Sequence, residues 1–95
     1  MKIHLTAIIK TKDEHREAVL SVLQHMVEQT RKEDACELYS LHQGIDDSNL
    51  FTFYEIWKSQ EGLDAHNQQP YIQAFGELAA DKLAEKPIVL ATTLI

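Results

Sequence analysis

Apolar side chains recur at every second position near the start of the chain. These positions are Ile3, Leu5, Ala7 and Ile9. A period of two is typical of a β-strand with one buried face, because successive side chains of a strand point to opposite sides. We therefore predict a strand over residues 2–10.

The period changes to that of a helix after this strand. The segment Thr11-Lys-Asp-Glu14 has the spacing of a capping box, in which the two end side chains satisfy free N–H groups of the first turn. The apolar stripe that follows consists of Ala18, Val19, Val22, Leu23, Met26 and Val27. Because the opposite side is polar, we predict an amphipathic helix that ends near Lys32 or Glu33.

Residues 36–43 and 50–58 alternate again, and the turn-forming segment Gly44-Ile-Asp-Asp-Ser-Asn49 lies between them. Two alternating runs joined by such a turn predict a β-hairpin. In the second run, one face would carry Phe51, Phe53, Glu55 and Trp57, and the other Leu50, Thr52, Tyr54 and Ile56. Both faces are largely apolar, which indicates that both are covered.

Two helices and a strand are predicted for the last third of the chain. Ser59 is an expected N-cap for a short helix over residues 60–66, and Pro70 suits the first turn of a longer helix. The apolar stripe of the longer helix is Ile72, Phe75, Leu78, Ala79 and Leu83. We expect Pro87 to end that helix and residues 88–95 to form the last strand, which is apolar on both sides.

This order of elements favours an α+β fold with one four-stranded antiparallel sheet. We expect a single domain over residues 1–95. The two long helices can cover only one face of such a sheet. Because the third and last strands are apolar on both faces, we predict a homodimer in which a second copy covers the other face.

Composition narrows the classes of partner. The formal net charge is −6 and the nine Lys and Arg residues are scattered, so nucleic acid and anionic membrane surfaces are poor partner candidates. No apolar run is long enough to span a bilayer, and the first ten residues lack the layout of a signal peptide. We therefore expect a cytoplasmic protein.

The single cysteine, Cys36, excludes an internal disulfide and fits a reducing compartment. It lies in a predicted strand, where a small buried hydrophobic residue is the simpler interpretation. The neighbouring Asp34 and Glu37 would raise the pKa of the thiol, which argues against a nucleophile.

Three segments carry a family resemblance. They are Cys36-Glu-Leu-Tyr-Ser-Leu-His42, Phe53-Tyr-Glu-Ile-Trp57, and Asp64-Ala-His66 ahead of Pro70-Tyr-Ile-Gln-Ala-Phe75. Together with the order of elements, they resemble the antibiotic biosynthesis monooxygenase (ABM) family, a branch of the dimeric α+β barrel, ferredoxin-like superfamily. The resemblance covers essentially the whole chain, although the family usually has glycine where Ala35 stands.

The resemblance implies a ferredoxin-like βαββαβ dimer with one pocket per subunit, between the sheet and its own helices. It implies oxygenation of a small quinol or phenolic aromatic compound with O₂, without metal or flavin. Other relatives isomerise or degrade small signalling molecules, and some degrade haem. The haem-degrading branch carries an asparagine on its first strand, and residues 2–11 contain none. The alternatives are an isomerase or signal-degrading enzyme of the same fold, or a non-catalytic dimeric binding or stress-response module.

His66 and Trp57 are the predicted catalytic residues. Histidine titrates near neutral pH and can take a proton from a quinol or phenol. An indole gives a flat apolar wall for an aromatic substrate. Structural interpretations stay open for both: a helix-end hydrogen bond for the histidine, and core packing for the tryptophan.

Four further residues are predicted to bind the substrate: Glu55, Tyr71, Tyr39 and His42. Glu55 shares a strand face with Trp57, and a structural ion pair is the simpler interpretation of its carboxylate. Tyr71 and Tyr39 could offer hydroxyl groups. His42 lies on a strand that could border the pocket or the dimer interface.

No metal or cofactor is expected. The five histidines include no pair at the i, i+4 spacing of zinc sites. The three glycines lie far apart and form no nucleotide or flavin fingerprint.

Overall fold

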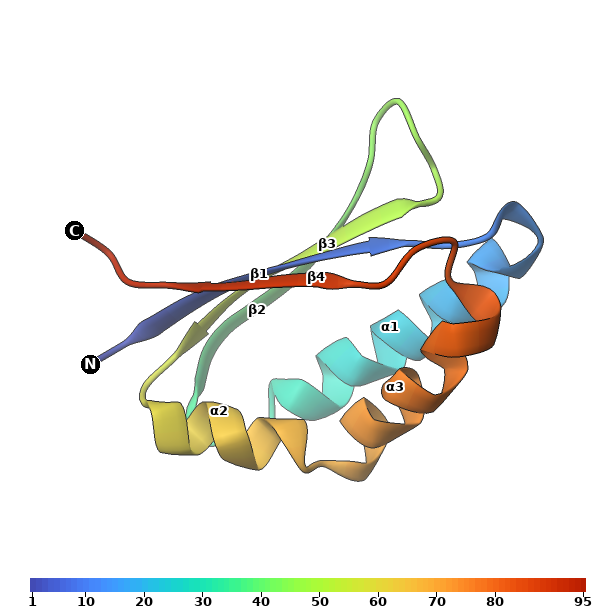
Figure 1. Ribbon diagram of the computed structural model, residues 1–95. Coiled ribbons are helices and arrows are strands. Elements are labelled where there is room, and N and C mark those ends of the chain that lie inside the picture. Colours follow the sequence, from blue (N-terminus) through green and yellow to red (C-terminus); the bar gives the residue numbers. More distant parts are fainter.

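The computed structural model describes residues 1–95 and contains the predicted order of strands and helices (Figure 1). The strands are β1 (Ile3–Lys10), β2 (Cys36–Gln43), β3 (Leu50–Trp57) and β4 (Ile88–Thr92). The helices are α1 (Arg16–Thr30), α2 (Gln60–Asn67) and α3 (Pro70–Lys82), with a short 3₁₀ turn, η1 (Asp13–His15), before α1. No helix combines the length and the apolar character that crossing a membrane requires.

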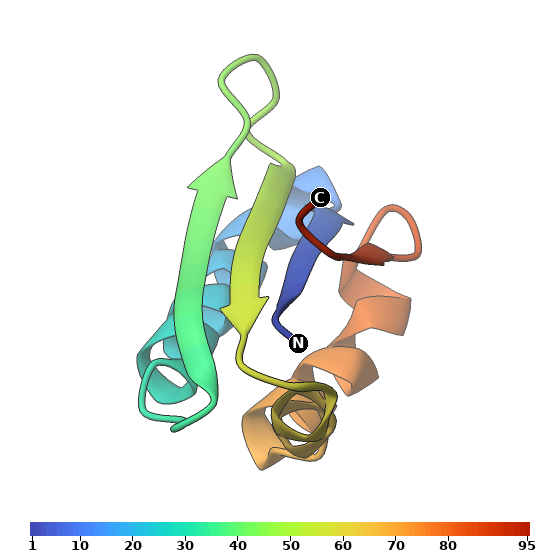
Figure 2. The same cartoon turned by 90° about the vertical axis from the view of Figure 1, so that its left-hand side faces the viewer.

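The four strands form one antiparallel sheet in the order β2-β3-β1-β4. All helices lie against one face of this sheet (Figure 1). The loop between β2 and β3 projects beyond the helices at one end (Figure 2). This is the α+β, ferredoxin-like arrangement that the sequence predicts, with α2 as a short helix between β3 and α3.

The buried core lies between the sheet and the helices and follows the predicted periods. Ile9, Phe51 and Phe53 are buried on the helix-facing side of the sheet. Val19 and Leu23 of α1 are buried in the same cluster. The period-two pattern of β1 and β3 and the helical period of α1 therefore meet in one core, as expected for two packed layers.

The opposite face of the sheet is uncovered and partly apolar. Leu38, Tyr54, Ile88 and Leu90 are 37%, 39%, 49% and 50% exposed, respectively. Their cross-strand register places all four on the side away from the helices. That a second copy of the chain covers this face stays a prediction.

The expected capping box at the start of α1 is wrong. Thr11 is 2% exposed and its hydroxyl donates to the backbone oxygen of Asn49 at 3.4 Å. It therefore extends the contacts between the end of β1 and the start of β3 instead of capping the helix. The chain then forms η1, and α1 begins at Arg16 without a side-chain cap. The hydroxyl of Thr11 cannot cap the helix because it is bonded to Asn49, far away in the sequence. This tertiary contact replaces the local capping motif. Ala18, expected in the apolar stripe, is exposed, and the buried face of α1 consists of Val19, Leu23, Met26 and Thr30.

The end of α3 also differs from the prediction. The helix ends at Lys82, five residues before Pro87, and Leu83 is extended. The reason is pairing with the end of β1: Ala84 N–H donates to the Lys10 carbonyl at 2.8 Å, and Lys12 N–H donates to the Lys82 carbonyl at 3.0 Å. The last strand ends at Thr92, which pairs with His4 near the start of β1, and not at residue 95 as expected.

Candidate active site

A small cavity of about 110 Å³ lies between the sheet and the helices α2 and α3. Ten of its fourteen lining residues are hydrophobic. Its titratable and amide groups come from Tyr39, Glu55, His66 and Asn67. An apolar cavity with a few convergent polar groups is the usual form of a small-molecule site.

Helix α2 brings two of these groups, His66 and Asn67, to the cavity. The Ser59 hydroxyl accepts a hydrogen bond from Gly62 N–H at 3.1 Å, which confirms the predicted N-cap. Leu63 and His66, three residues apart on one face of α2, are buried. Gly62 is required for this close packing, because a Cβ there would collide with the methyl group of Ala35. The helix therefore sits close enough to the sheet to bury an imidazole.

His66 is 4% exposed and stands among aromatic rings. Its ring centroid is 4.4 Å from that of Trp57 and 5.6 Å from that of Tyr39. Burial lowers the pKa of His66 below its usual value, although a hydrogen bond and the charge of Glu33 oppose this shift. The imidazole is therefore mainly neutral at pH 7, which is the form that accepts a proton.

Glu33 is the functional candidate that the sequence analysis missed. It lies in the turn between α1 and β2, and its side chain is only 12% exposed. Its Oε2 is 2.8 Å from His66 Nδ1 and accepts a hydrogen bond from the Tyr71 hydroxyl at 2.5 Å. One sequence signal was available: an acid just after a helix C-terminus, where the helix dipole disfavours negative charge.

Glu55 faces the same cavity from β3. The expected ion pair is wrong, because no cation contacts this carboxylate; Trp57 Nε1–H donates to Oε1 at 2.8 Å instead. Burial raises the pKa of Glu55 to about 7, while the hydrogen bond from Trp57 works against the rise and the charge of Glu33 adds to it. Near neutral pH this side chain is therefore divided between an acid and a base form.

Trp57 is completely buried and does not line the cavity. It lies behind the lining, where its indole contacts the His66 ring and holds the Glu55 carboxyl. The geometry thus corresponds to the core-packing interpretation of this residue. Trp57 therefore influences the cavity through the lining residues beside it, Tyr39, Glu55 and His66.

The remaining candidates are divided between the cavity and other places. Tyr39 is buried in the cavity wall, and burial raises the pKa of its hydroxyl. Tyr71 lies in a groove between α1 and α3, and its hydroxyl reaches Glu33 from that side. His42 is exposed on the uncovered face of the sheet, opposite Thr52 on β3, and is separate from the cavity. Of the predicted site residues, only Tyr39, Glu55 and His66 therefore line the cavity. Trp57 lies behind the lining, Tyr71 is connected to His66 through Glu33, and His42 is elsewhere.

Cys36 is half-buried near this group. Burial raises the pKa of its thiol, and Glu33 and Glu55 add to the rise. The predicted direction is confirmed, but the acids responsible are these two and not the sequence neighbours.

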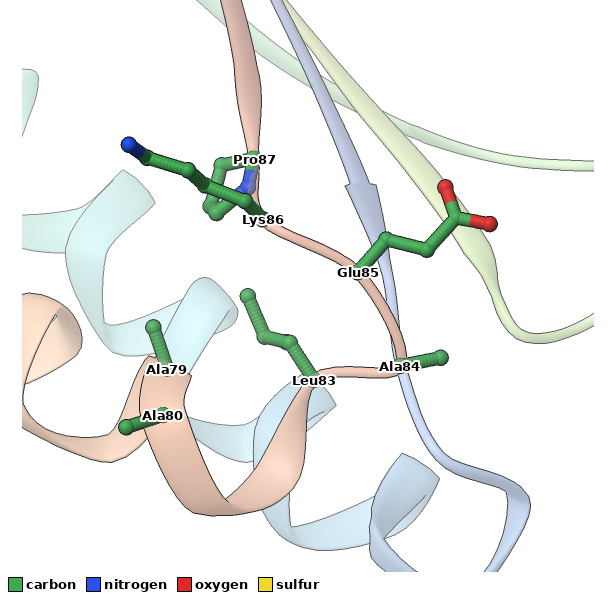
Figure 3. A pocket seen from close by; sticks show the side chains of 7 residues that line it. All are labelled: Ala79, Ala80, Leu83, Ala84, Glu85, Lys86 and Pro87. Carbon is green, nitrogen blue, oxygen red and sulfur yellow. The ribbon is translucent and has the colours of Figure 1, made fainter.

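Another hollow lies at the end of α3, around the loop to β4 (Figure 3). It is lined mainly by small side chains and by Leu83. The charged ends of Glu85 and Lys86 point in opposite directions (Figure 3). This arrangement offers no pair of groups for proton transfer, so we place the site in the cavity beside His66. No three His, Cys, Asp or Glu side chains are grouped as a metal site would require.

Comparison with known proteins finds relatives of this chain. The sequence profile described as antibiotic biosynthesis monooxygenase matches residues 2–78. The Bacillus subtilis protein YcnE, whose provisional name is that of a monooxygenase, is 33% identical over 92 residues, which cover 97% of both chains. The uncharacterized Synechocystis protein sll1783 is 35% identical over 77 residues; these cover 81% of this chain but only 52% of the relative. The chain thus spans about half the length of that relative.

The fold has close counterparts among solved structures. The structure of Rv0793 from Mycobacterium tuberculosis matches with a TM-score of 0.94 at 22% identity and covers 100% of this chain and 96% of the other. At that identity the likeness shows the fold alone. The profile match and the nearly full-length similarity to YcnE go further, and they show that this chain belongs to the antibiotic biosynthesis monooxygenase family.

Proposed function

We propose that this protein is a cofactor-independent monooxygenase that oxidises a small quinol or phenol with O₂ in the cavity beside His66. The observation that carries the proposal is a buried imidazole, whose pKa burial lowers, in the wall of a mostly apolar cavity. The provisional names of YcnE and Rv0793 as monooxygenases support the reaction class. The substrate class is the one that the family resemblance implies, and a buried imidazole in an apolar cavity is compatible with it.

His66 takes the hydroxyl proton of the substrate, and the resulting phenolate is electron-rich. The phenolate passes one electron to O₂, and the radical pair combines to form a C–O bond. His66 returns its proton to the peroxide anion so formed, and the resulting hydroperoxide loses water and leaves a quinone carbonyl. In this sequence a phenol and one O₂ give a quinone and one water, so the substrate supplies all the electrons and no separate reductant is needed.

The protein positions the two reactants and excludes water from the cavity. Phe53 and Ile72, among other apolar side chains of the lining, exclude water from the reacting pair. Binding O₂ and the phenolate side by side in one cavity raises their effective concentration and so increases the rate of reaction. Glu55 in its protonated form can donate a hydrogen bond to a second oxygen of the substrate.

The size of the cavity limits the substrate. The volume of about 110 Å³ is below the roughly 150 Å³ of an apolar cavity that accepts one benzene ring. A single-ring substrate therefore requires a small outward movement of α2 or α3, and a multi-ring substrate a large one. This comparison favours a small quinol over an extended aromatic compound.

The proposal includes a homodimer joined through the uncovered sheet faces. Half-exposed apolar side chains on that face support it, since isologous contacts are the commonest way to cover such a surface. A cytoplasmic location is also proposed, and the lone cysteine fits it.

Oxygen uptake by the purified, chelator-treated protein tests the function. A panel of single-ring quinols and phenols is supplied, and the autoxidation blank is subtracted. We expect saturable uptake that is lost in His66→Ala while the variant keeps its fold. Unchanged turnover in that variant would exclude His66 as the base, and no uptake above the blank would reject the oxygenase.

A proton-transfer enzyme is the second candidate, either an isomerase or an enzyme that degrades a signalling molecule. The observation in its favour is that His66 and Glu55 line one cavity, the first neutral and the second with a pKa raised to about 7. Such a pair can exchange protons with a substrate at neutral pH. This activity would continue without oxygen, so an anaerobic assay separates the two. Ligand-dependent stabilisation without any product would instead indicate a non-catalytic binding or stress-response module.

A further inference from the structure

We propose that Glu33 is the positioning residue of this site, and that it holds the His66 ring as the Nδ1–H tautomer so that Nε2 is the proton-accepting atom. The catalytic consequence rests on the proposed function. The tautomer itself does not, and it can be measured without a substrate.

One carboxylate oxygen of Glu33 makes hydrogen-bond contacts with two side chains, which come from two different helices. Oε2 is 2.8 Å from Nδ1 of His66 on α2 and 2.5 Å from the hydroxyl of Tyr71 on α3. The side chains of His66 and Glu33 are only 5% and 12% exposed, respectively. Water therefore competes little for this carboxylate, and charge-assisted bonds in such a setting are among the stronger ones.

The choice of tautomer follows from which groups can donate. An ionised carboxylate only accepts hydrogen bonds, so the ring nitrogen beside it must carry a hydrogen. A neutral imidazole has one N–H, which leaves the lone pair on Nε2. The one hydrogen-bond contact of the His66 side chain within the chain is at Nδ1. His66 lines the cavity and Glu33 does not. We therefore infer that Nε2, the nitrogen that Glu33 does not hold, is the one that faces the cavity.

No other neighbour of the ring can make this choice. Trp57 and Tyr39 contact His66 through their rings. The Glu55 carboxyl accepts the N–H of Trp57 and is not bonded to the imidazole. Glu33 alone holds Nδ1, and it would also stabilise the imidazolium that forms when Nε2 takes a proton.

The test is the protonation state of each ring nitrogen, read by long-range nitrogen–proton NMR correlation. In the unaltered protein above the pKa of His66, we expect hydrogen on Nδ1 and none on Nε2. Hydrogen on Nε2 there would overturn the proposal, whatever any variant does.

Glu33→Gln keeps the size of the side chain and removes the charge. We expect it to lower the pKa of His66 further and to introduce the Nε2–H tautomer, because Glu33 raises this pKa and an amide can donate to Nδ1. Glu77→Gln, at an exposed position on α3, is the matched control and should change neither quantity. An unchanged tautomer together with an unchanged pKa in Glu33→Gln would overturn the proposal. If that variant does not fold, the measurement on the unaltered protein decides alone.

Kinetics separate this inference from the proposed function. With an active substrate, Glu33→Gln should lower kcat by about 10- to 100-fold, shift the pH profile and leave KM nearly unchanged. A protein with the Nδ1–H tautomer but no oxygen uptake would refute the oxygenase and leave the positioning role intact. Normal kcat in a variant with the wrong tautomer would refute the positioning role instead.

Discussion

Glu55 and Trp57, two residues apart on β3, are joined by a hydrogen bond of 2.8 Å from the indole Nε1–H to Oε1, and both side chains are buried. Neighbours at i and i+2 point to the same face of a strand, so the sequence spacing alone brings them together. The consequence is a buried carboxyl whose only side-chain partner is a neutral donor. Such a group resists ionisation, which makes it a usable acid near neutral pH.

Glu55 should make the protein less stable as the pH rises. Its pKa is raised from 4.5 to about 7 on folding, so the folded state binds its proton more tightly than the unfolded state. The stabilisation is present below pH 4.5 and is lost as the pH rises to about 7, a change on the order of 3 kcal/mol. His66, whose pKa is lowered, acts in the opposite direction as the pH falls below its usual pKa.

Glu55→Gln isolates this effect. The amide oxygen still accepts the Trp57 N–H, and no charge is buried at high pH. In urea unfolding at a series of pH values, we expect the variant to be more stable than the unaltered protein at pH 8 and similar to it at pH 5. Parallel pH curves for the two proteins would contradict the assignment of a raised pKa to Glu55.

Tyr71→Phe should change the pKa of His66, although the two side chains are connected only through Glu33. The change removes one of the two hydrogen bonds to Glu33 Oε2, at a cost of about 1–2 kcal/mol in the free energy of unfolding. The carboxylate then interacts more strongly with the imidazole, so the pKa of His66 should rise. NMR titration of the ring measures this shift, and a fall in the pKa would mean that Tyr71 does not share Glu33 as described.

Gly62→Ala should destabilise the protein by about 1–3 kcal/mol, the usual cost of an overpacked site. The added methyl group would collide with the methyl group of Ala35. Ala35→Gly removes that obstacle, so the double variant should recover much of the lost stability. Thermal or urea unfolding of the four proteins forms a double-mutant cycle. Additive losses would show that the two methyl groups do not compete for the same space.

Leu90→Lys should convert the proposed dimer to a monomer. Leu90 is 50% exposed on the uncovered sheet face, so a lysine there harms an interface more than it harms the single chain. Ile45→Lys, at a fully exposed position in the β2–β3 loop (100%), is the control and should leave the mass unchanged. Light scattering during gel filtration gives both masses. A monomeric unaltered protein, or a dimeric Leu90→Lys variant, would reject this interface.

Local patterns identified most of the fold. Ser59 is an N-cap in the structure because its hydroxyl acts within four residues of the chain, on Gly62 N–H. Pro70 stands in the first turn of α3, where its missing N–H is not needed. The capping box at Thr11 failed for the opposite reason, since its hydroxyl bonds with Asn49, 38 residues away.

The sequence predicted the candidate site only in part. His66 was found because an imidazole has a specific chemical use at neutral pH, and Glu55 because it shares a strand face with Trp57. The expected ion pair of Glu55 failed because a sequence does not say which cations reach a buried carboxylate. Likewise, Trp57 was expected near a cleft, but the depth of a side chain behind the lining depends on how α2 packs against β3.

The sequence by itself determined the alternating strands, the amphipathic helices, the hairpin and the likeness to a family, because these depend on periodicity and on contacts between near neighbours. Tertiary structure alone decided the Glu33–His66–Tyr71 group, whose first two members are 33 residues apart. It also decided where α3 stops, since backbone groups at the end of β1 pair with the residues that follow Lys82. Burial sets which titratable groups change their pKa, and burial exists only after the helices have packed on the sheet.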